Sequence, residues 1–292
     1  MKDKIPLVVI LGPTASGKTA LSIEMAKIYN GEIICADSRT VYKGMDIGTA
    51  KPSREEINSV PHWGLDLVEP GEYFSVADFK EYAIKKIDEI KDRGHVPFLV
   101  GGSGLYIDSV IFDYKFGSKV DIDIRDKFEK FSLSELYEYC NINNISLPEN
   151  IKNKRYIVRS IENFGCDTSR RTKPIDDVII VGISVEKNLL RSRIEIRAEQ
   201  LFDNGSVEEA RLLGEKYGWD SEALKGNIYP LAHLYLDGKI SWEDMKSKYV
   251  ILDWHLAKRQ MTWFKRNGYI NWFTSEDARI FLFDKLAKLT SS

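Results

Sequence analysis

The chain has 292 residues, of which 43 % are hydrophobic and 29 % charged, and its formal net charge is −2. This composition is that of an ordinary globular protein and excludes disordered and fibrous classes. No apolar run approaches the ~18 residues of a membrane helix. The run Leu7–Leu11 is too short for the core of a signal peptide and leads straight into a glycine-rich loop, so we expect no secretion signal. Three cysteines far apart in the sequence, Cys35, Cys140 and Cys166, indicate reduced thiols. We therefore expect a cytoplasmic protein, monomeric and without a membrane partner.

The charge is unevenly distributed along the chain. Between Lys152 and Lys173 there are seven basic residues against two acidic ones. Such a local excess of positive charge can hold phosphate groups on a protein whose total charge is near zero. A solvated helix and loop would have the same composition, so the pattern alone leaves both interpretations open.

The chain opens with a strand, a glycine-rich loop and a helix. The β-branched run Leu7–Leu11 predicts a fully buried strand. Residues 12–19 read GPTASGKT, which is the complete P-loop pattern. In such a loop the glycines let backbone N–H groups wrap a phosphate, the lysine supplies a cation, and the last hydroxyl can ligate Mg²⁺. The predicted phosphate-binding residues are Gly12, Pro13, Thr14, Ala15, Ser16, Gly17, Lys18 and Thr19, with Thr19 as the Mg²⁺ ligand.

A second strand follows the first helix. The helical pattern runs from Leu21 to Ile28, and we expect Gly31 to cap its C-terminus. Residues 32–35 predict a strand, which Asp37 closes. Because ligands of open α/β sheets sit at the carboxyl ends of strands, Asp37 should face the P-loop ligand, as a general base or as the partner of a metal-bound water. An Asp-Ser pair is also an ordinary turn or helix cap, which is the alternative.

The next helix and strand repeat this arrangement. Apolar residues at helical spacing predict a helix over residues 76–90, ended by Gly94, and residues 96–100 predict a third buried strand. The strand runs into a Gly-Gly-Ser-Gly turn. Its glycines could serve the turn only, or Ser103 could present a hydroxyl across the cleft from Asp37. The alternation of buried strands with helices indicates a parallel α/β sheet.

Two features between these strands receive no role from physics alone. Residues 47–52 read IGTAKP, an unusual string for an idle loop. His62 has no partner at metal-ligand spacing, which argues against a metal role.

From about residue 114 the sequence becomes polar and helical, and a strand pattern returns only at Val178–Ile183. After Leu189 the chain is helical and rich in aromatic and basic residues. We therefore predict the α/β fold class, with a P-loop NTPase-like parallel sheet core and a helical insertion domain. The core with its C-terminal helices is assigned to residues 1–113 and 176–292, and the insertion to residues 114–175.

The C-terminal region mixes cations with aromatic residues over residues 256–266, which read LAKRQMTWFKR. A helix of this composition could grip a nucleic-acid backbone, or could be amphipathic with a solvated basic face. We interpret the aromatic residues of this region as packing groups rather than base-stacking groups: Trp254, Trp263, Phe264, Trp272 and Phe273.

Taken together, five strings resemble the tRNA dimethylallyltransferase family, whose members prenylate the adenosine next to the anticodon. They are GPTASGKT, ADSRTVYKGMDIGTAKP, VGGSGLYI, NKRYIVRSIE and AKRQMTWF, in the family's order and over most of the chain. The resemblance implies a P-loop core with a helical insertion. It also implies dimethylallyl diphosphate and tRNA as substrates, and Mg²⁺ as cofactor.

The resemblance assigns roles to particular residues. Lys18 and Thr19 would bind the diphosphate and Mg²⁺, and Asp37 would be the general base at the exocyclic amine of the acceptor adenine. Ser103 stands where the family has threonine, and is counted with Lys18 and Asp37 as catalytic. The implied tRNA-binding residues are Asp37, Ser38, Arg39, Thr40, Ser103, Arg125, Arg155, Tyr156, Ile157, Val158, Arg159, Lys258, Arg259 and Gln260.

Several positions depart from the family pattern. Thr40 replaces a glutamine, and Trp63 replaces the second of two paired histidines. Asp253 and Trp254 stand where a Thr-Arg pair is usual, and residues 228–231 reduce a Gly-Tyr-Lys-Glu-like segment. These departures leave the implied reaction class unchanged.

Three other functions remain open at this point. A small-molecule P-loop kinase would share Lys18 and Thr19 but would need lid arginines around a transferred phosphoryl group. A prenyltransferase acting on free adenine nucleotides would share the P-loop and Asp37, although it would not need the basic C-terminal helix. A non-catalytic, nucleotide-dependent RNA-binding protein would have no need for a carboxylate at the end of the second strand.

Overall fold

The computed structural model describes residues 5–117, 122–148, 150–166, 168–226 and 228–290. The chain divides into two compact units. The larger unit comprises Met1–Ile111 and Pro174–Ser292, and the smaller unit comprises Phe112–Lys173. Among the helices that the structure describes, none combines the length and the hydropathy that crossing a bilayer requires.

The larger unit is built on a six-stranded parallel sheet with the order β3-β2-β4-β1-β5-β6. The strands are β1 (Leu7–Leu11), β2 (Gly31–Ala36), β3 (His62–Trp63), β4 (Val96–Gly101), β5 (Val178–Ile183) and β6 (Asn271–Phe273). The four predicted strands are confirmed, β1 and β5 with the bounds expected. The sequence did not indicate β3 and β6, because strands of two and three residues carry too little pattern to recognise.

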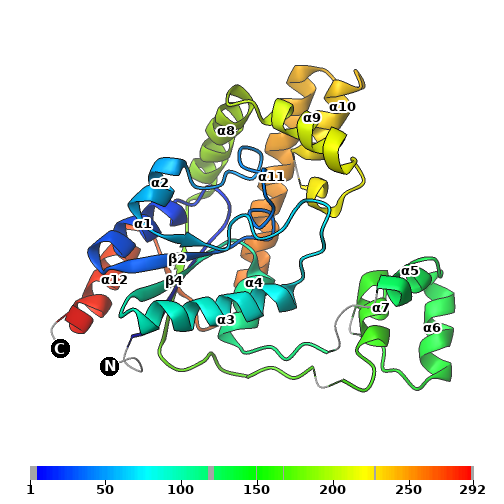
Figure 1. The fold of residues 1–292 in the computed structure, drawn as a ribbon, viewed down its shortest axis with the longest axis horizontal. Helices are drawn as coiled ribbons and strands as arrows, with labels where there is room; N and C mark the ends of the chain where they lie inside the picture. The colour runs from blue at the N-terminus through cyan, green and yellow to red at the C-terminus, as the bar shows by residue number, and fades with distance from the viewer. Residues whose placement is uncertain (1–4, 118–121, 149, 167, 227, 291–292) are drawn as a thin grey trace. The chain divides into compact units, whose positions relative to one another are not determined.

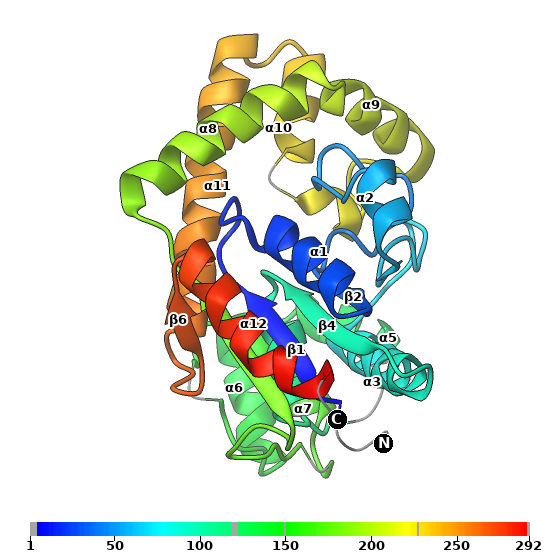
Figure 2. The same cartoon turned by 90° about the vertical axis from the view of Figure 1, so that its left-hand side faces the viewer.

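Helices cover both faces of this sheet (Figures 1 and 2). On one face, α1 (Lys18–Ile28) and α12 (Ser275–Thr290) form a common hydrophobic core with side chains such as Val8 and Ile10 of β1. The other face is covered by α3 (Val76–Asp92) and α4 (Gly104–Ile111). Burial on both sides explains why the strands are continuous apolar runs without alternation.

Further helices pack beyond the carboxyl ends of the strands (Figure 2). They are α2 (Arg54–Ser59), α8 (Lys187–Asp203), α9 (Ser206–Tyr217), the short 3₁₀ helix η2 (Glu222–Lys225), α10 (Tyr229–Leu236) and α11 (Trp242–Phe264). Contacts between α8 and α11 and between α9 and α10 join most of them into one group. The smaller unit holds α5 (Ile122–Glu129), α6 (Leu133–Ile142) and α7 (Lys154–Glu162), with a core of its own around Leu136 and Ile157.

The expected glycine cap of the first helix is wrong. The helix is followed by Tyr29 as C-cap, and Asn30 takes the left-handed backbone conformation, with a φ of 50°. Gly31 instead begins β2, where a Cβ atom would lie 2.3 Å from a ring carbon of Phe98. This glycine is therefore required by close strand packing, since asparagine also tolerates the left-handed region.

A buried carboxylate fixes the edge of the sheet at β3. Glu32 is 2 % exposed and accepts hydrogen bonds from Trp63 Nε1 at 2.6 Å and from Arg93 Nε and Nη2 at 2.9 and 2.8 Å. His95 Nδ1 lies 2.6 Å from the same carboxylate. Burial alone would raise the pKa of Glu32, but the hydrogen bonds from Arg93, His95 and Trp63 bring the pKa below the ordinary glutamate value. Trp63, which departs from the family's histidine, is thus an integral partner of this carboxylate.

We expect Glu32→Gln to lower the free energy of unfolding at pH 7 by about 2 kcal/mol, because an amide cannot satisfy three donors. A folded-state pKa below the unfolded value stabilises above the unfolded pKa and loses that stabilisation as the pH falls through the folded value. The difference between wild type and variant should therefore shrink in acid. Urea unfolding at several pH values measures this difference in unfolding free energy. Glu24→Gln is the control, because the Glu24 side chain is half-exposed. An unfolding free energy equal to that of the wild type at pH 7 would contradict this account.

Candidate active site

Ten of the predicted site residues line one cavity of about 400 Å³ in the larger unit. It lies at the carboxyl ends of β1, β2 and β4, which are adjacent in the sheet, so that the P-loop, Asp37 and Ser103 meet. The predicted residues that line this cavity are Thr14, Lys18, Thr19, Asp37, Ser38, Arg39, Thr40, Ser103, Arg259 and Gln260.

The P-loop leads from β1 into the N-terminus of α1. Gly17 has a φ of 90° as the N-cap of α1, and Ala15 also lies in the left-handed region at 59°. Gly17 gives the helix no side-chain cap, so the first N–H groups of α1 are left for an anion. The Lys18 ammonium donates to the Pro13 carbonyl at 3.1 Å, which folds the side chain back along the loop.

Two distant helices hold the P-loop in place. Arg193 Nη1 of α8 donates to the Ser16 carbonyl at 3.3 Å, and the Thr14 N–H donates to Gln260 Oε1 of α11 at 2.8 Å. Gln260 also packs against Gly102, where a Cβ atom would lie 2.3 Å from Gln260 Nε2. Gln260, which the family resemblance assigned to tRNA, therefore bridges the P-loop and the turn after β4. Sequence analysis did not identify Arg193.

Asp37 and Ser103 are joined through one turn. The Ser38 N–H donates to Ser103 Oγ at 3.0 Å, and the Arg39 N–H donates to Asp37 Oδ1 at 2.8 Å. Ser103 therefore anchors the turn that carries Asp37, and the second carboxylate oxygen of Asp37 is the one that the turn leaves for a ligand. Arg39 is itself held, since its Nη1 donates to the Glu222 carbonyl of η2 at 2.7 Å.

A charged cluster that the sequence did not reveal forms the wall beside the P-loop. Arg197 Nη2 of α8 lies 2.5 Å from the buried carboxylate of Asp253 on α11, and Tyr249 lines the same wall. Arg197 Nε has no hydrogen-bond partner among the described residues. Burial, and next the positive charge of Arg197, lower the pKa of Lys18 to about 8, against the opposing effect of Asp37 and Asp253. Two cations therefore face one cavity, as a site for a polyanion requires.

Two of the departures from the family pattern, Asp253 and Trp254, lie in and beside this wall. Asp253 is the partner of Arg197, and Trp254 packs with Leu190 and Ile194 in a small hydrophobic cluster that Ala15 of the P-loop also contacts. Lys258 does not line the cavity; its ammonium lies 5.3 Å from the centre of the Trp254 ring. The aromatic residues of this region make packing contacts, including Phe264, which is 1 % exposed.

The remaining residues assigned to tRNA lie in the smaller unit, on α5 and α7. Ile157 and Val158 are 0 % and 3 % exposed in its hydrophobic core, so their side chains stabilise the unit and are not available to an RNA. Arg125 and Arg159 both pair with Glu162, and Arg155 and Tyr156 are exposed. The helical period places the side chains of these two apolar residues on the inner face. The assignment of the stretch to tRNA stays a prediction.

The donor set near Lys18 suits a magnesium ion that is held mainly by its substrate. Thr19 lines the cavity with its hydroxyl-bearing side chain. Within the described ranges, no group of three or more histidine, cysteine, aspartate or glutamate side chains is placed to hold a metal. Mg²⁺ commonly takes one or two protein oxygens together with substrate phosphates and waters, so Thr19 fits this pattern.

Comparison with known proteins gives a consistent result. The family model described as IPP transferase matches residues 40–267. A tRNA dimethylallyltransferase of Anoxybacillus flavithermus is 39 % identical, over 96 % of this chain and 93 % of the relative. One from Bacillus anthracis is 36 % identical, over 92 % of this chain and 90 % of the relative.

Solved structures agree. The full-length tRNA isopentenylpyrophosphate transferase of Bacillus halodurans matches with a TM-score of 0.73 at 33 % identity, over 99 % of this chain and 100 % of that one. The structure of tRNA delta(2)-isopentenylpyrophosphate transferase from Staphylococcus epidermidis matches with a TM-score of 0.72 at 32 % identity, over 98 % of both chains. On this similarity, which extends along almost the whole sequence, the protein belongs to the IPP transferase family of tRNA dimethylallyltransferases.

Proposed function

We propose that this protein transfers the dimethylallyl group of dimethylallyl diphosphate to the exocyclic amine of the adenosine 3′-adjacent to the anticodon in tRNA. The observation that carries the proposal is one cavity in which the P-loop after β1 and the two cations Lys18 and Arg197 share the space with the Asp37 carboxylate at the end of β2. The family to which the chain belongs supports the same reaction.

The phosphate side of the cavity would activate the leaving group. The C–O bond of an allylic diphosphate breaks readily once the departing charge is stabilised, and Lys18, Arg197 and the first N–H groups of α1 supply that stabilisation. Arg197 Nε has a hydrogen to donate that no described residue accepts. Mg²⁺, when bound at Thr19 and the diphosphate oxygens, would add further charge neutralisation.

The carboxylate side would activate the acceptor. The exocyclic amine of adenine is a weak nucleophile because its lone pair is delocalised into the ring. Asp37, held by the Arg39 N–H, is oriented to take a proton from that amine as the new C–N bond forms. To reach a carboxylate inside a cavity, the adenine would have to leave the base stack of the anticodon loop.

Protonation of Lys18 should control the binding of pyrophosphate. We expect the affinity for pyrophosphate to fall as the pH rises above about 8, by up to ~tenfold per pH unit, because the ligand needs a protonated Lys18 that the free protein increasingly lacks. The Lys18→Ala variant should bind pyrophosphate ~2–3 kcal/mol more weakly than the wild type at pH 7. Calorimetric titration over pH 6.5–9.5 measures both, and the variant controls for titration of the ligand. A parallel decline in both proteins would show that Lys18 is not the titrating group.

Asp37→Asn should leave both substrates bound but reduce the single-turnover rate by ~10²–10⁴-fold, because an amide cannot accept the proton. The amide oxygen can still accept the Arg39 N–H, so the turn should keep its shape. Rapid-quench assays with labelled dimethylallyl diphosphate measure the rate, and pyrophosphate titration provides the binding control. If the variant kept more than about a third of the wild-type rate, the base would have to be another group.

The acceptor is tested by salt dependence and substrate comparison. Binding of a folded tRNA should weaken with salt along a log–log slope of about −0.7 to −0.9 per phosphate contacted. Replacing Lys258 and Arg259 by alanine should flatten that slope by up to about two units, whereas Lys248→Ala on the same helix should not. Adenosine monophosphate should be a poor acceptor beside tRNA. A flat salt profile together with equal rates on both acceptors would identify a free-nucleotide prenyltransferase instead.

A further inference from the structure

The loop of residues 46–52, which carries the IGTAKP string, forms one wall of the cavity. Gly48, Thr49, Ala50 and Pro52 line the cavity, and we call these four residues the loop wall. The loop wall belongs to the same chain segment as Asp37, which lies at the other end of that segment. Whatever fixes the segment therefore sets the distance between the general base and this wall.

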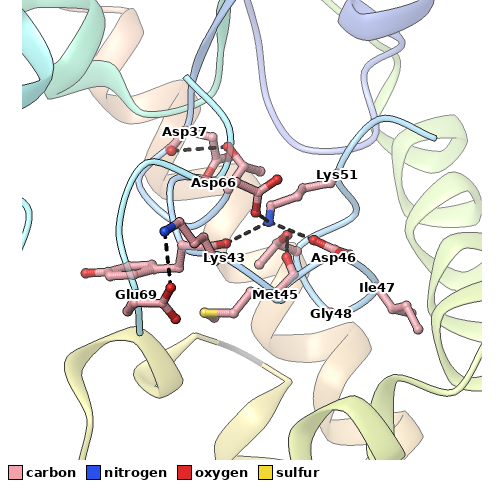
Figure 3. Close-up of polar contacts among 12 residues, drawn as sticks. Asp37, Lys43, Met45, Asp46, Ile47, Gly48, Lys51, Asp66 and Glu69 are labelled. Atoms are coloured by element: carbon pink, nitrogen blue, oxygen red, sulfur yellow. Dashed lines mark hydrogen bonds and ion pairs between the residues drawn. The ribbon is translucent and has the colours of Figure 1, made fainter. Parts of the chain in front are cut away.

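An internal cation holds the segment from inside. The Lys51 side chain is 4 % exposed, and its ammonium donates to the Tyr42 carbonyl at 2.6 Å, to Asp46 Oδ1 at 2.7 Å and to Asp66 Oδ1 at 2.6 Å (Figure 3). Three oxygens use all three N–H donors of the ammonium group, so Lys51 has none left for a ligand. Its position explains why a lysine stands in this string: Lys51 ties the loop to Asp46 and to the neighbouring segments at Tyr42 and Asp66.

An external anion holds the same segment from α9. Glu209 Oε2 accepts the N–H groups of Asp46 at 2.8 Å and Ile47 at 2.7 Å, and Glu209 Oε1 accepts the N–H of Gly48 at 2.8 Å. The Tyr229 hydroxyl donates to Oε1 at 2.9 Å. Successive N–H groups that converge on one carboxylate form the concave anion site otherwise seen around bound phosphates. Here the anion is the protein's own, about 160 residues away in sequence.

The backbone of the loop wall has little freedom to move. Ala50 lies in the left-handed region with a φ of 53°, a conformation that persists where the surroundings impose it. A Cβ atom on Gly48 would lie 2.8 Å from both Ile228 Cγ2 and the Tyr229 hydroxyl. Because the backbone at Gly48 touches α10 and is bonded to α9, any movement of Glu209 would move the loop wall relative to Asp37.

We infer that Glu209 is a positioning residue for the acceptor: through the backbone of Asp46–Gly48 it fixes the loop wall of the cavity that the P-loop also lines. The inference rests on the proposed function. The diphosphate side is built by the P-loop with Arg193 and Gln260 from other helices, whereas the Glu209 and Lys51 contacts hold the segment that follows Asp37. Loss of Glu209 should therefore affect transfer to tRNA without affecting diphosphate binding.

The sharpest test is Glu209→Gln. Each carboxylate oxygen accepts two hydrogen bonds, and three of the four donors are backbone N–H groups that cannot accept. Whichever position the amide nitrogen takes, at least one of these N–H groups will therefore face a donor. We expect kcat/KM for tRNA to fall ~10- to 100-fold, since small displacements of reacting groups have effects of this size. The dissociation constant for pyrophosphate should stay within about twofold of the wild-type value. Glu208→Gln is the matched control, because Glu208 is the exposed residue next to Glu209 on α9 and pairs with Arg211 and not with the loop.

Gly48→Ala perturbs the same contact from the loop side and should give the same kinetic pattern. Unchanged turnover of tRNA in both variants would overturn the inference. Equal losses of pyrophosphate affinity and turnover would also overturn it, because the contact would then be a general element of the fold. A change confined to the KM for dimethylallyl diphosphate would do the same, because it would place the loop wall on the donor side.

Hydrogen exchange separates this inference from the proposed function. Glu209→Gln should speed amide exchange at residues 46–48 about tenfold or more while leaving the P-loop amides unchanged, and Glu208→Gln should not. Absence of prenyl transfer in the wild type would refute the proposed function alone, since the exchange of these amides would still report the contact. Unaltered exchange at residues 46–48 would refute the contact itself, whatever the activity.

Discussion

The adjacency of β2, β4 and β1 in one parallel sheet is the constraint on which the site depends. Parallel strands direct their carboxyl ends to the same edge, so the segments that follow them must share one space. The P-loop follows β1, the Asp37 turn follows β2, and the Ser103 turn follows β4. The Ser38–Ser103 hydrogen bond joins two of these segments, and Gln260 joins the third to them. The reacting groups are thereby held by strands that are buried on both faces.

The charges around the P-loop are arranged for a ligand that brings negative charge with it. Lys18 and Arg197 face the same cavity, and the positive charge of Arg197 helps to lower the pKa of Lys18, while Asp37 and Asp253 offset part of this repulsion. An anionic group between the two cations would remove this repulsion without any rearrangement of the protein. Such a site is oriented before its ligand arrives, which is the condition under which electrostatic stabilisation of a leaving group is most effective. Asp253, although it departs from the family pattern, is what holds Arg197 at that wall.

Much of the fold follows from short-range patterns in the sequence. The apolar runs of β1 and β5 were recognisable because a strand buried on both faces is apolar throughout, and the P-loop because its chemistry fixes four positions. The roles of Arg193 and Glu209 could not be seen, since each acts on a segment more than 150 residues away along the chain. The role of Arg197 could not be seen either, since it is paired with Asp253 of another helix and reaches Lys18 only in the folded cavity. Ile157 shows a different limit: a motif transferred as a block includes residues whose job is to fill a core.

The smaller unit begins and ends between two segments of chain that are bonded to each other. Ile175 N–H donates to the Ile111 carbonyl at 2.7 Å, Arg171 N–H to the Phe112 carbonyl at 2.8 Å, and Lys115 N–H to the Ser169 carbonyl at 2.8 Å. For the parallel sheet, residues 112–173 are therefore equivalent to a loop whose two ends are joined by hydrogen bonds. The entropy of closing a loop grows only with the logarithm of its length, by about 0.6 kcal/mol for each doubling. An insertion joined in this way can lengthen, shorten or exchange its helices over evolutionary time, at almost no thermodynamic consequence for the chemistry that the sheet supports.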